Sequence, residues 1–137
     1  MDEIMVNQSE KTKVKLTGIK ILVAEDEDTG FRVIERILNE YGINSIRATN
    51  GKEAVELVDS NPNIDIILMD IKMPVMNGIE AARIIKSKRP DLPIIANSAF
   101  AMPGDKQVFK DAGCEEFISK PIDAEQLISL IRKLVKM

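Results

Sequence analysis

The chain of 137 residues contains no histidine and a single cysteine, Cys114. The lack of histidine excludes any mechanism in which this chain itself supplies an imidazole base, an imidazole metal ligand or a phosphohistidine. One cysteine excludes an internal disulfide, and we expect a structural role for it and a reducing, cytoplasmic location for the protein. No apolar run is long enough to span a bilayer, and residues 1–16 lack the apolar core of a secretory signal peptide.

The chain also lacks an excess of positive charge. It has 19 lysines and arginines against 22 aspartates and glutamates, a formal net charge of −3. We therefore expect no general attraction to nucleic acid or to an anionic membrane. The length suits one domain with a substantial core. Residues 1–17 are polar and unpatterned, so we expect a flexible N-terminal tail or linker there and a single domain over residues 18–137.

What the sequence does contain is a regular alternation of short apolar runs and segments of helical periodicity. The apolar runs predict five strands, over residues 20–24, 43–49, 64–70, 92–97 and 116–119. A helical pattern follows each run, although the pattern over 102–112 is weak because it contains Pro103 and Gly104. Such repeats predict an α/β fold with a parallel sheet and helices on both faces. The Asn50, Asn77 and Asp123 side chains precede three of these helices and predict N-caps.

Polar side chains follow four of the five predicted strands. They are Glu25 and Asp26 after the first, Asp70 at the end of the third, Ser98 after the fourth and Lys120 after the fifth. The carboxyl ends of parallel strands share one edge, where ligands of open α/β sheets bind. Clustered carboxylates repel one another unless a cation intervenes, and oxygen ligands without His or Cys favour Mg²⁺. A carboxylate can also act as a nucleophile and form an aspartyl-phosphate.

Each of these residues, taken singly, also fits an ordinary structural role. A lone aspartate at a strand end is usually a helix cap or a solvated turn residue, and a lone lysine is usually solvated. The acidic residues 25–28 could simply favour the N-terminus of the helix that follows. Taken together, the structural reading requires four coincidences at one sheet edge, so we favour the functional reading.

Four motifs identify a family resemblance. They read ILVAEDE at residues 21–27, ILMDIKMPVMNG at 67–78, PIIANSA at 93–99 and FISKP at 117–121. In this order and spacing the motifs resemble those of the receiver domains of two-component signalling, and their residues are most similar to those of receivers in hybrid sensor histidine kinases. The resemblance implies a flavodoxin-like doubly wound sheet with strand order 2-1-3-4-5.

The resemblance also implies roles for residues in the acidic site. Asp70 matches the phosphoacceptor and Asp26 the direct Mg²⁺ ligand. Glu25 matches the acid that holds the metal through water, and the backbone carbonyl of Lys72 matches the remaining protein ligand. The implied donor is a phosphohistidine on a separate sensor histidine kinase or histidine phosphotransfer domain.

Three further matches concern the response to phosphorylation. Ser98 matches the hydroxyl residue that turns toward the phosphoryl group, Phe117 the aromatic residue that follows it, and Lys120 the lysine that pairs with the phosphate. The Lys120-Pro121 bond is cis in similar domains. Asn97 departs from the family pattern, which has an apolar residue there, and this places the packing beneath the switch in question.

Lys72 and Phe100 occupy the positions that flank the mouth of the site in this family. Both are bulky, so we expect them to obstruct the hydrolytic water and to prolong the phosphorylated state. We expect output through contact with a downstream protein, either from a stand-alone receiver or from one belonging to a hybrid kinase.

Two other functions are compatible with parts of the sequence. One is a pseudo-receiver that binds a partner without being phosphorylated, although Asp26, Asp70, Ser98 and Lys120 are all present. The other is a Mg²⁺-dependent phosphohydrolase, which would need a base to activate water. Since no histidine is present, we expect a signalling domain that catalyses only its own phosphorylation and slow dephosphorylation.

Overall fold

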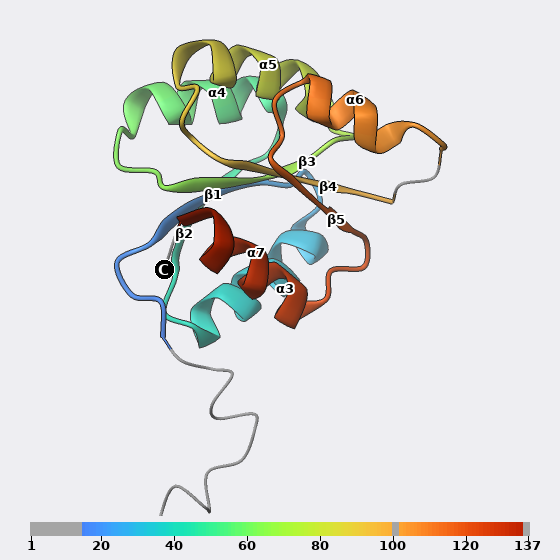
Figure 1. The fold of residues 1–137 in the computed structure, drawn as a ribbon. Helices are drawn as coiled ribbons and strands as arrows, with labels where there is room; N and C mark the ends of the chain where they lie inside the picture. The colour runs from blue at the N-terminus through green and yellow to red at the C-terminus, as the bar shows by residue number, and fades with distance from the viewer. Residues whose placement is uncertain (1–14, 100–101, 136–137) are drawn as a thin grey trace, which may run out of the picture.

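A parallel sheet lies between two layers of helices (Figure 1). The computed structural model describes residues 15–99 and 102–135. The strand order is β2-β1-β3-β4-β5, and all four strand pairs are parallel, which confirms the predicted doubly wound fold. In chain order the elements are β1 (Lys20–Ala24), α3 (Asp28–Glu40), β2 (Asn44–Ala48), α4 (Gly51–Ser60), β3 (Ile66–Asp70), α5 (Gly78–Lys88), β4 (Ile94–Ser98), α6 (Asp105–Asp111), β5 (Glu116–Ser119) and α7 (Ala124–Val135).

The central strand β3 is buried along its whole length and supplies both hydrophobic cores. Figure 1 shows α4, α5 and α6 on one face of the sheet and α3 and α7 on the other. Ile67 and Met69 pack into the core under the first group, while Ile66 and Leu68 pack under the second. Because successive residues of a strand point to opposite faces, a fully apolar strand is what a sheet covered on both sides requires. Asp70 ends this strand as a carboxylate at the limit of the core.

The three predicted N-caps are confirmed. The side chain of Asn50 accepts a hydrogen bond from the Glu53 amide at 2.8 Å, and that of Asn77 accepts one from the Glu80 amide at 2.9 Å. Asp123 accepts one from the Gln126 amide at 3.1 Å. Each cap satisfies an amide that the first helical turn leaves without a backbone partner. These caps fix where α4, α5 and α7 begin.

The helix observed within residues 102–112 is shorter than the segment for which the sequence predicted a weak helix. Helix α6 begins only at Asp105, because Gly104 adopts a left-handed conformation with φ of 86° and ends the turn that precedes it. The Val108 side chain is 45% exposed. Phe109 and Ala112 are buried, so a narrow apolar stripe holds this helix against the sheet.

The packed region begins before the predicted boundary at residue 18. Leu16 is 3% exposed and its amide donates a hydrogen bond to the carbonyl of Tyr41 at 2.6 Å. Leu16 packs into the core that α3 and α7 cover, and removing its apolar side chain from water stabilises the fold. The rest of the predicted tail, residues 1–14, lies outside the described residues. Within residues 15–99 and 102–135, no helix combines the length and the apolar content that crossing a membrane requires.

Candidate functional site

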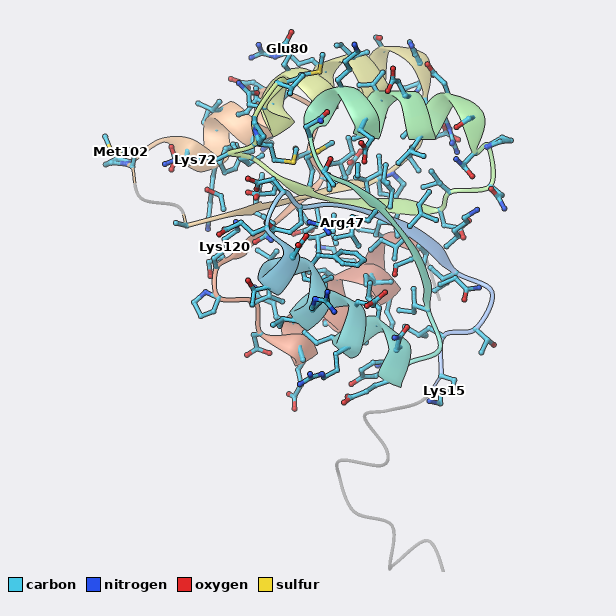
Figure 2. All side chains as sticks on the ribbon, turned by 180° about the vertical axis from the view of Figure 1, so that it is seen from behind. Lys15, Arg47, Lys72, Glu80, Met102 and Lys120 are labelled. Carbon is cyan, nitrogen blue, oxygen red and sulfur yellow. The ribbon has the colours of Figure 1, made fainter. Side chains whose placement is uncertain are left out.

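The predicted site residues gather at the carboxyl edge of the sheet. Asp70 is the last residue of β3 and Ser98 the last residue of β4, while Glu25 and Lys120 directly follow β1 and β5. Lys72 and Lys120 lie on the same side of the molecule in Figure 2. Parallel strands therefore bring together residues that are far apart in the sequence, as expected.

Three carboxylates form the centre of the site. Glu25, Asp26 and Asp70 each offer an oxygen, and these oxygens lie within 4.8 Å of one another. Glu25 and Asp70 are both 2% exposed. Burial raises the pKa of the Glu25 carboxyl, although the Glu27 amide, which donates to Glu25 Oε2 at 3.1 Å, acts in the opposite direction. Burial likewise raises the pKa of Asp70. These shifts reflect negative charge held away from water, an arrangement that a bound cation would relieve.

Lys120 faces two of these carboxylates. Its Nζ lies 3.1 Å from Asp70 Oδ2 and 3.7 Å from Glu25 Oε1. Burial alone would lower the pKa of Lys120, but the hydrogen bond and charge of Asp70 outweigh it and raise that pKa. The ammonium group is therefore positively charged at neutral pH. This single positive charge faces a cluster of three carboxyl groups.

Backbone groups fix the orientation of Asp70 and Lys120. The Lys72 amide donates to Asp70 Oδ1 at 3.3 Å, and the Lys120 amide donates to the Ser98 carbonyl at 3.0 Å. The Lys120-Pro121 peptide bond is cis, as the family resemblance implied. Asp70 thus has each carboxylate oxygen directed at a separate donor.

An open cavity of about 270 Å³ connects this cluster to α6. Asp70, Ser98 and Lys120 line one part of it, and Met102 and Phe109 line another. Phe117, which is partly buried, packs against Phe109 with ring centroids 6.3 Å apart and ring planes tilted by 39°. Ser98 thus lines the cavity that joins Asp70 to α6, and Phe117 contacts α6 through Phe109.

Some expectations are not tested by this geometry. Phe100 lies outside the described residues. Lys72 is exposed and lines the cavity, but the assigned roles of its side chain and carbonyl stay predictions, as do those of the other site residues. Cys114 is buried, and burial raises the pKa of its thiol to about 12, in keeping with a structural role.

Asn97 is 2% exposed, and its Oδ1 has no hydrogen-bond partner among the described residues. It lines a cavity with Pro121 and Ile122, whereas Ser98 lines the cavity at Asp70. Because neighbouring strand residues face opposite sides, Asn97 affects the packing next to α3 and α7 rather than the packing around α6.

Two residues that shape the site were not predicted. A Cβ on Gly78 would lie 2.2 Å from the Asp70 carbonyl oxygen, so only glycine allows α5 to begin that close to β3. Arg47 hydrogen-bonds the carbonyl of Glu25 at 3.1 Å. Asn77-Gly78 is a residue pair typical of turns, which could have indicated the role of Gly78. Nothing in the sequence around Arg47 indicates a contact with the acidic segment.

Comparison with known proteins assigns the family. Residues 21–132 match the model described as the response regulator receiver domain. Two-component response regulator 24 of Arabidopsis thaliana is 35% identical over 133 residues, covering 97% of this chain and 94% of that protein. Hybrid signal transduction histidine kinase M of Dictyostelium discoideum is 39% identical over 121 residues, covering 84% of this chain but 5% of the kinase.

A solved structure supports the same assignment. One chain in the co-crystal structure of the Saccharomyces cerevisiae histidine phosphotransfer signaling protein Ypd1 with the receiver domain of its downstream response regulator Ssk1 matches with a TM-score of 0.80. The sequences are 27% identical, and the match covers 87% of this chain and 90% of that one. With the family model matching most of its length, this chain belongs to the response-regulator receiver domains of two-component signalling.

Proposed function

We propose that Asp70 accepts a phosphoryl group from a phosphohistidine on a separate sensor histidine kinase or histidine phosphotransfer domain. The observation that carries this proposal is the position of Asp70, buried at the end of β3, 3.1 Å from Lys120 and clustered with Glu25 and Asp26. The donor is a separate domain because this chain contains no histidine.

In this reaction a carboxylate oxygen of Asp70 forms a bond to phosphorus. The bond between phosphorus and the imidazole nitrogen of the donor breaks, and the nitrogen keeps the electron pair. Asp70 must be ionised to attack, and the hydrogen bond and charge of Lys120 favour that form against the effect of burial. The Lys72 amide holds the second carboxylate oxygen and so orients the first.

The cluster of hard oxygen donors fits Mg²⁺. Glu25, Asp26, Asp70 and the backbone carbonyl of Lys72 would hold it, Glu25 through water. When bound, the ion supplies positive charge that offsets the charge on the transferring phosphoryl oxygens. Glu25 and Asp26 therefore serve to hold charge next to Asp70 and not to react themselves.

Lys120 and Ser98 would bind the phosphoryl oxygens once the group is on Asp70. Lys120 would exchange its contact with the Asp70 carboxylate for one with the phosphate, and Ser98 would donate its hydroxyl from the end of β4. Phe117 would then repack against Phe109, shifting α6 and β5 between two surface states. The short α6 has one fully buried large side chain, Phe109, as expected of an element of low local stability.

The relatives support the class of partner. One is named a response regulator, another a hybrid histidine kinase, and a matching structure contains a histidine phosphotransfer protein. We accordingly propose a histidine-phosphorylated donor, a downstream protein as output, and a cytoplasmic site of action. The domain acts as a phosphoacceptor that catalyses its own modification and not as an enzyme on a separate substrate.

Transfer from a phosphorylated histidine phosphotransfer domain tests this proposal. Label should move from the donor to this chain in a Mg²⁺-dependent reaction and should reach at most one phosphoryl group per chain. An Asp70→Asn variant should receive none, and Asp91→Asn, which alters an exposed carboxylate before β4, should behave as the wild type. Sustained release of phosphate over many turnovers would instead indicate a phosphohydrolase, and no transfer with any donor would favour a pseudo-receiver.

A further inference from the structure

Arg47 connects three points of the segment that carries the acidic residues. It lies on β2, beside β1 (Figure 2). Its Nε donates to the carbonyl oxygen of Glu25 at 3.1 Å, and its Nη1 donates to Asp28 Oδ1 at 2.8 Å. The guanidinium carbon lies 4.9 Å from the centre of the Phe31 ring, one turn into α3. The Arg47 guanidinium therefore contacts the residue that follows β1, the first residue of α3 and a ring one turn further along α3.

This arrangement is more than an exposed ion pair. The Arg47 side chain is 22% exposed, and its Nη2 is buried without a hydrogen-bond partner among the described residues. Burying part of a guanidinium is costly unless its donors and its face are used. Two of the donors and the ring contact supply that compensation here.

The segment held by Arg47 is the one that supplies two of the three clustered carboxylates. Glu25 is also held through its own amide, which donates to the carbonyl of Ala48, again on β2, at 2.9 Å. Its side chain is turned back by the Glu27 amide. Asp26 lies between the two Arg47 anchor points, Glu25 and Asp28, and therefore depends on them for its position.

We propose that Arg47 is a positioning residue for the divalent cation: it fixes residues 25–28 so that Glu25 and Asp26 are arranged for metal before the metal binds. This inference rests on the proposed Mg²⁺ site. Arg47 itself touches neither the cation nor the phosphoryl group. It acts through the backbone of Glu25 and the first residue of α3.

The sign of the effect separates positioning from simple electrostatics. A positive guanidinium near a cation site repels the cation, so removing its charge should by itself tighten Mg²⁺ binding. Removing the hydrogen bonds should loosen residues 25–28 and weaken binding, because the free protein would then have to order them on binding. A neutral replacement at Arg47 thus gives opposite outcomes under the two accounts.

Calorimetric titration with Mg²⁺ alone tests the proposal. Arg47→Gln should bind roughly tenfold more weakly than the wild type, at the lower end of the usual effect of losing a partner of a metal ligand. Arg47→Lys, which keeps the charge but not the planar fork, should also bind more weakly. Arg36→Gln is the matched control, since it removes an equal charge from an exposed position on α3 and should bind as the wild type.

Hydrogen exchange in the absence of metal shows whether the effect is local. In Arg47→Gln the amides of residues 25–28 should exchange faster, while the amides of β3 keep their wild-type protection. An equal gain in exchange over the whole sheet would show ordinary loss of stability and overturn the proposal. Should Arg47→Gln not fold, Arg47→Lys is compared with the wild type in the same way.

Phosphorylation by acetyl phosphate gives a second readout. The Mg²⁺ concentration for half-maximal rate should rise in Arg47→Gln, while the rate at saturating Mg²⁺ stays close to that of the wild type. Mg²⁺ affinity equal to or tighter than the wild-type value would overturn the role of Arg47. A wild-type protein that does not bind Mg²⁺ would instead overturn the proposed function on which this inference rests.

Discussion

Gly78 allows helix α5 to start against the backbone of Asp70. Its amide donates to the Ile71 carbonyl at 2.9 Å, and a Cβ at this position would meet the Asp70 carbonyl oxygen at 2.2 Å and Met69 Cγ at 2.9 Å. Contacts this short require backbone movement, because a carbonyl in the central strand has no free rotation. The glycine therefore protects the position of Asp70 from steric displacement.

Replacing Gly78 by alanine should damage both the fold and the site. We expect Gly78→Ala to lower the free energy of unfolding by about 2 kcal/mol, within the usual range for overpacking, and to weaken phosphorylation by acetyl phosphate. Gly18→Ala is the control, because Gly18 has φ of 90° but no atom within 4 Å of the added Cβ. It should lose about 1 kcal/mol through backbone strain alone and keep wild-type phosphorylation. Denaturant unfolding and intact mass measure the two effects, and equal phosphorylation by both variants would contradict the steric argument.

Lys72 and Phe100 are expected to set the lifetime of the phosphorylated state. Lys72 lines the cavity at Asp70, and we propose that its side chain obstructs the approach of a hydrolytic water. Replacing both residues by alanine should speed loss of the phosphoryl group severalfold, because water gains access to phosphorus. Decay of the phosphorylated mass after removal of acetyl phosphate gives the rate. Unchanged decay in the double variant would end this explanation of lifetime.

At the scale of elements, the strands could be predicted more accurately than the loops. β3 and β4 read as apolar runs because both faces of the sheet are covered, and the polar residue that ends each run marks the carboxyl edge. The start of α6 could not be predicted, since it depends on the left-handed Gly104 and on burial of Phe109 against Phe117. Contacts of this kind join residues distant in sequence, and periodicity does not encode them.

The loop after Asp70 shows the same limit. Val75 has φ of 68°, and the Met76 amide donates to the Pro74 carbonyl at 2.7 Å across it, which is a strained three-residue turn. Met73-Pro74 and Asn77-Gly78 are residue pairs typical of turns, but neither pair indicates a left-handed valine. A β-branched residue rarely adopts this conformation, so the surrounding contacts impose it.

Helix α5 is tied to β4 at the edge of the sheet opposite the acidic site. Lys86 Nζ donates to the carbonyls of Pro90 and Leu92 at 3.1 and 2.8 Å and pairs with Glu115. Glu115 in turn accepts the Ile94 amide at 2.9 Å, at the first residue of β4. The Lys86 side chain is 13% exposed and its hydrogen bond to the Leu92 carbonyl is partly buried, whereas the Glu115 side chain is 38% exposed.

Lys86→Met should therefore destabilise the protein by about 2 kcal/mol, because it leaves the partly buried Leu92 carbonyl without its donor and Glu115 without its cation. Lys88→Met, on the same helix, removes the ion pair with Asp59 that is 3.0 Å long and about half exposed. That change should cost no more than about 0.5 kcal/mol. Denaturant unfolding of both variants measures the difference, and equal losses would contradict the importance of the Lys86 network.

At the scale of the whole molecule, the fold buries negative charge, and this lowers the stability of the metal-free protein. Two cores hold the sheet from both faces, and the acidic cluster sits at the edge between them. The pKa of Asp70 is raised in the folded state, mainly by burial. Because the Asp70 carboxyl holds its proton more tightly in the folded protein than in the unfolded chain, its ionisation lowers the free energy of unfolding. This loss of stability is present at neutral pH.

Asp70→Asn should consequently stabilise the metal-free protein, by on the order of 1 kcal/mol, the typical size of a single-residue effect. Adding Mg²⁺ should raise the thermal midpoint of the wild type, since the ion binds the folded state, and should raise that of the variant much less. Calorimetric melting with and without Mg²⁺ measures both effects. A variant less stable than the wild type without metal would show that the contact with Lys120 outweighs the burial of charge.

The most direct test of the phosphoacceptor role is the intact mass after incubation with acetyl phosphate and Mg²⁺. We predict one added phosphoryl group on the wild type, and none on Asp70→Asn or in the absence of Mg²⁺. If the wild type gains no mass, titration with beryllofluoride followed by NMR separates rapid hydrolysis from a site that cannot bind a phosphoryl group. No adduct together with no beryllofluoride binding, or an adduct that persists in Asp70→Asn, would contradict the assignment of Asp70 as phosphoacceptor.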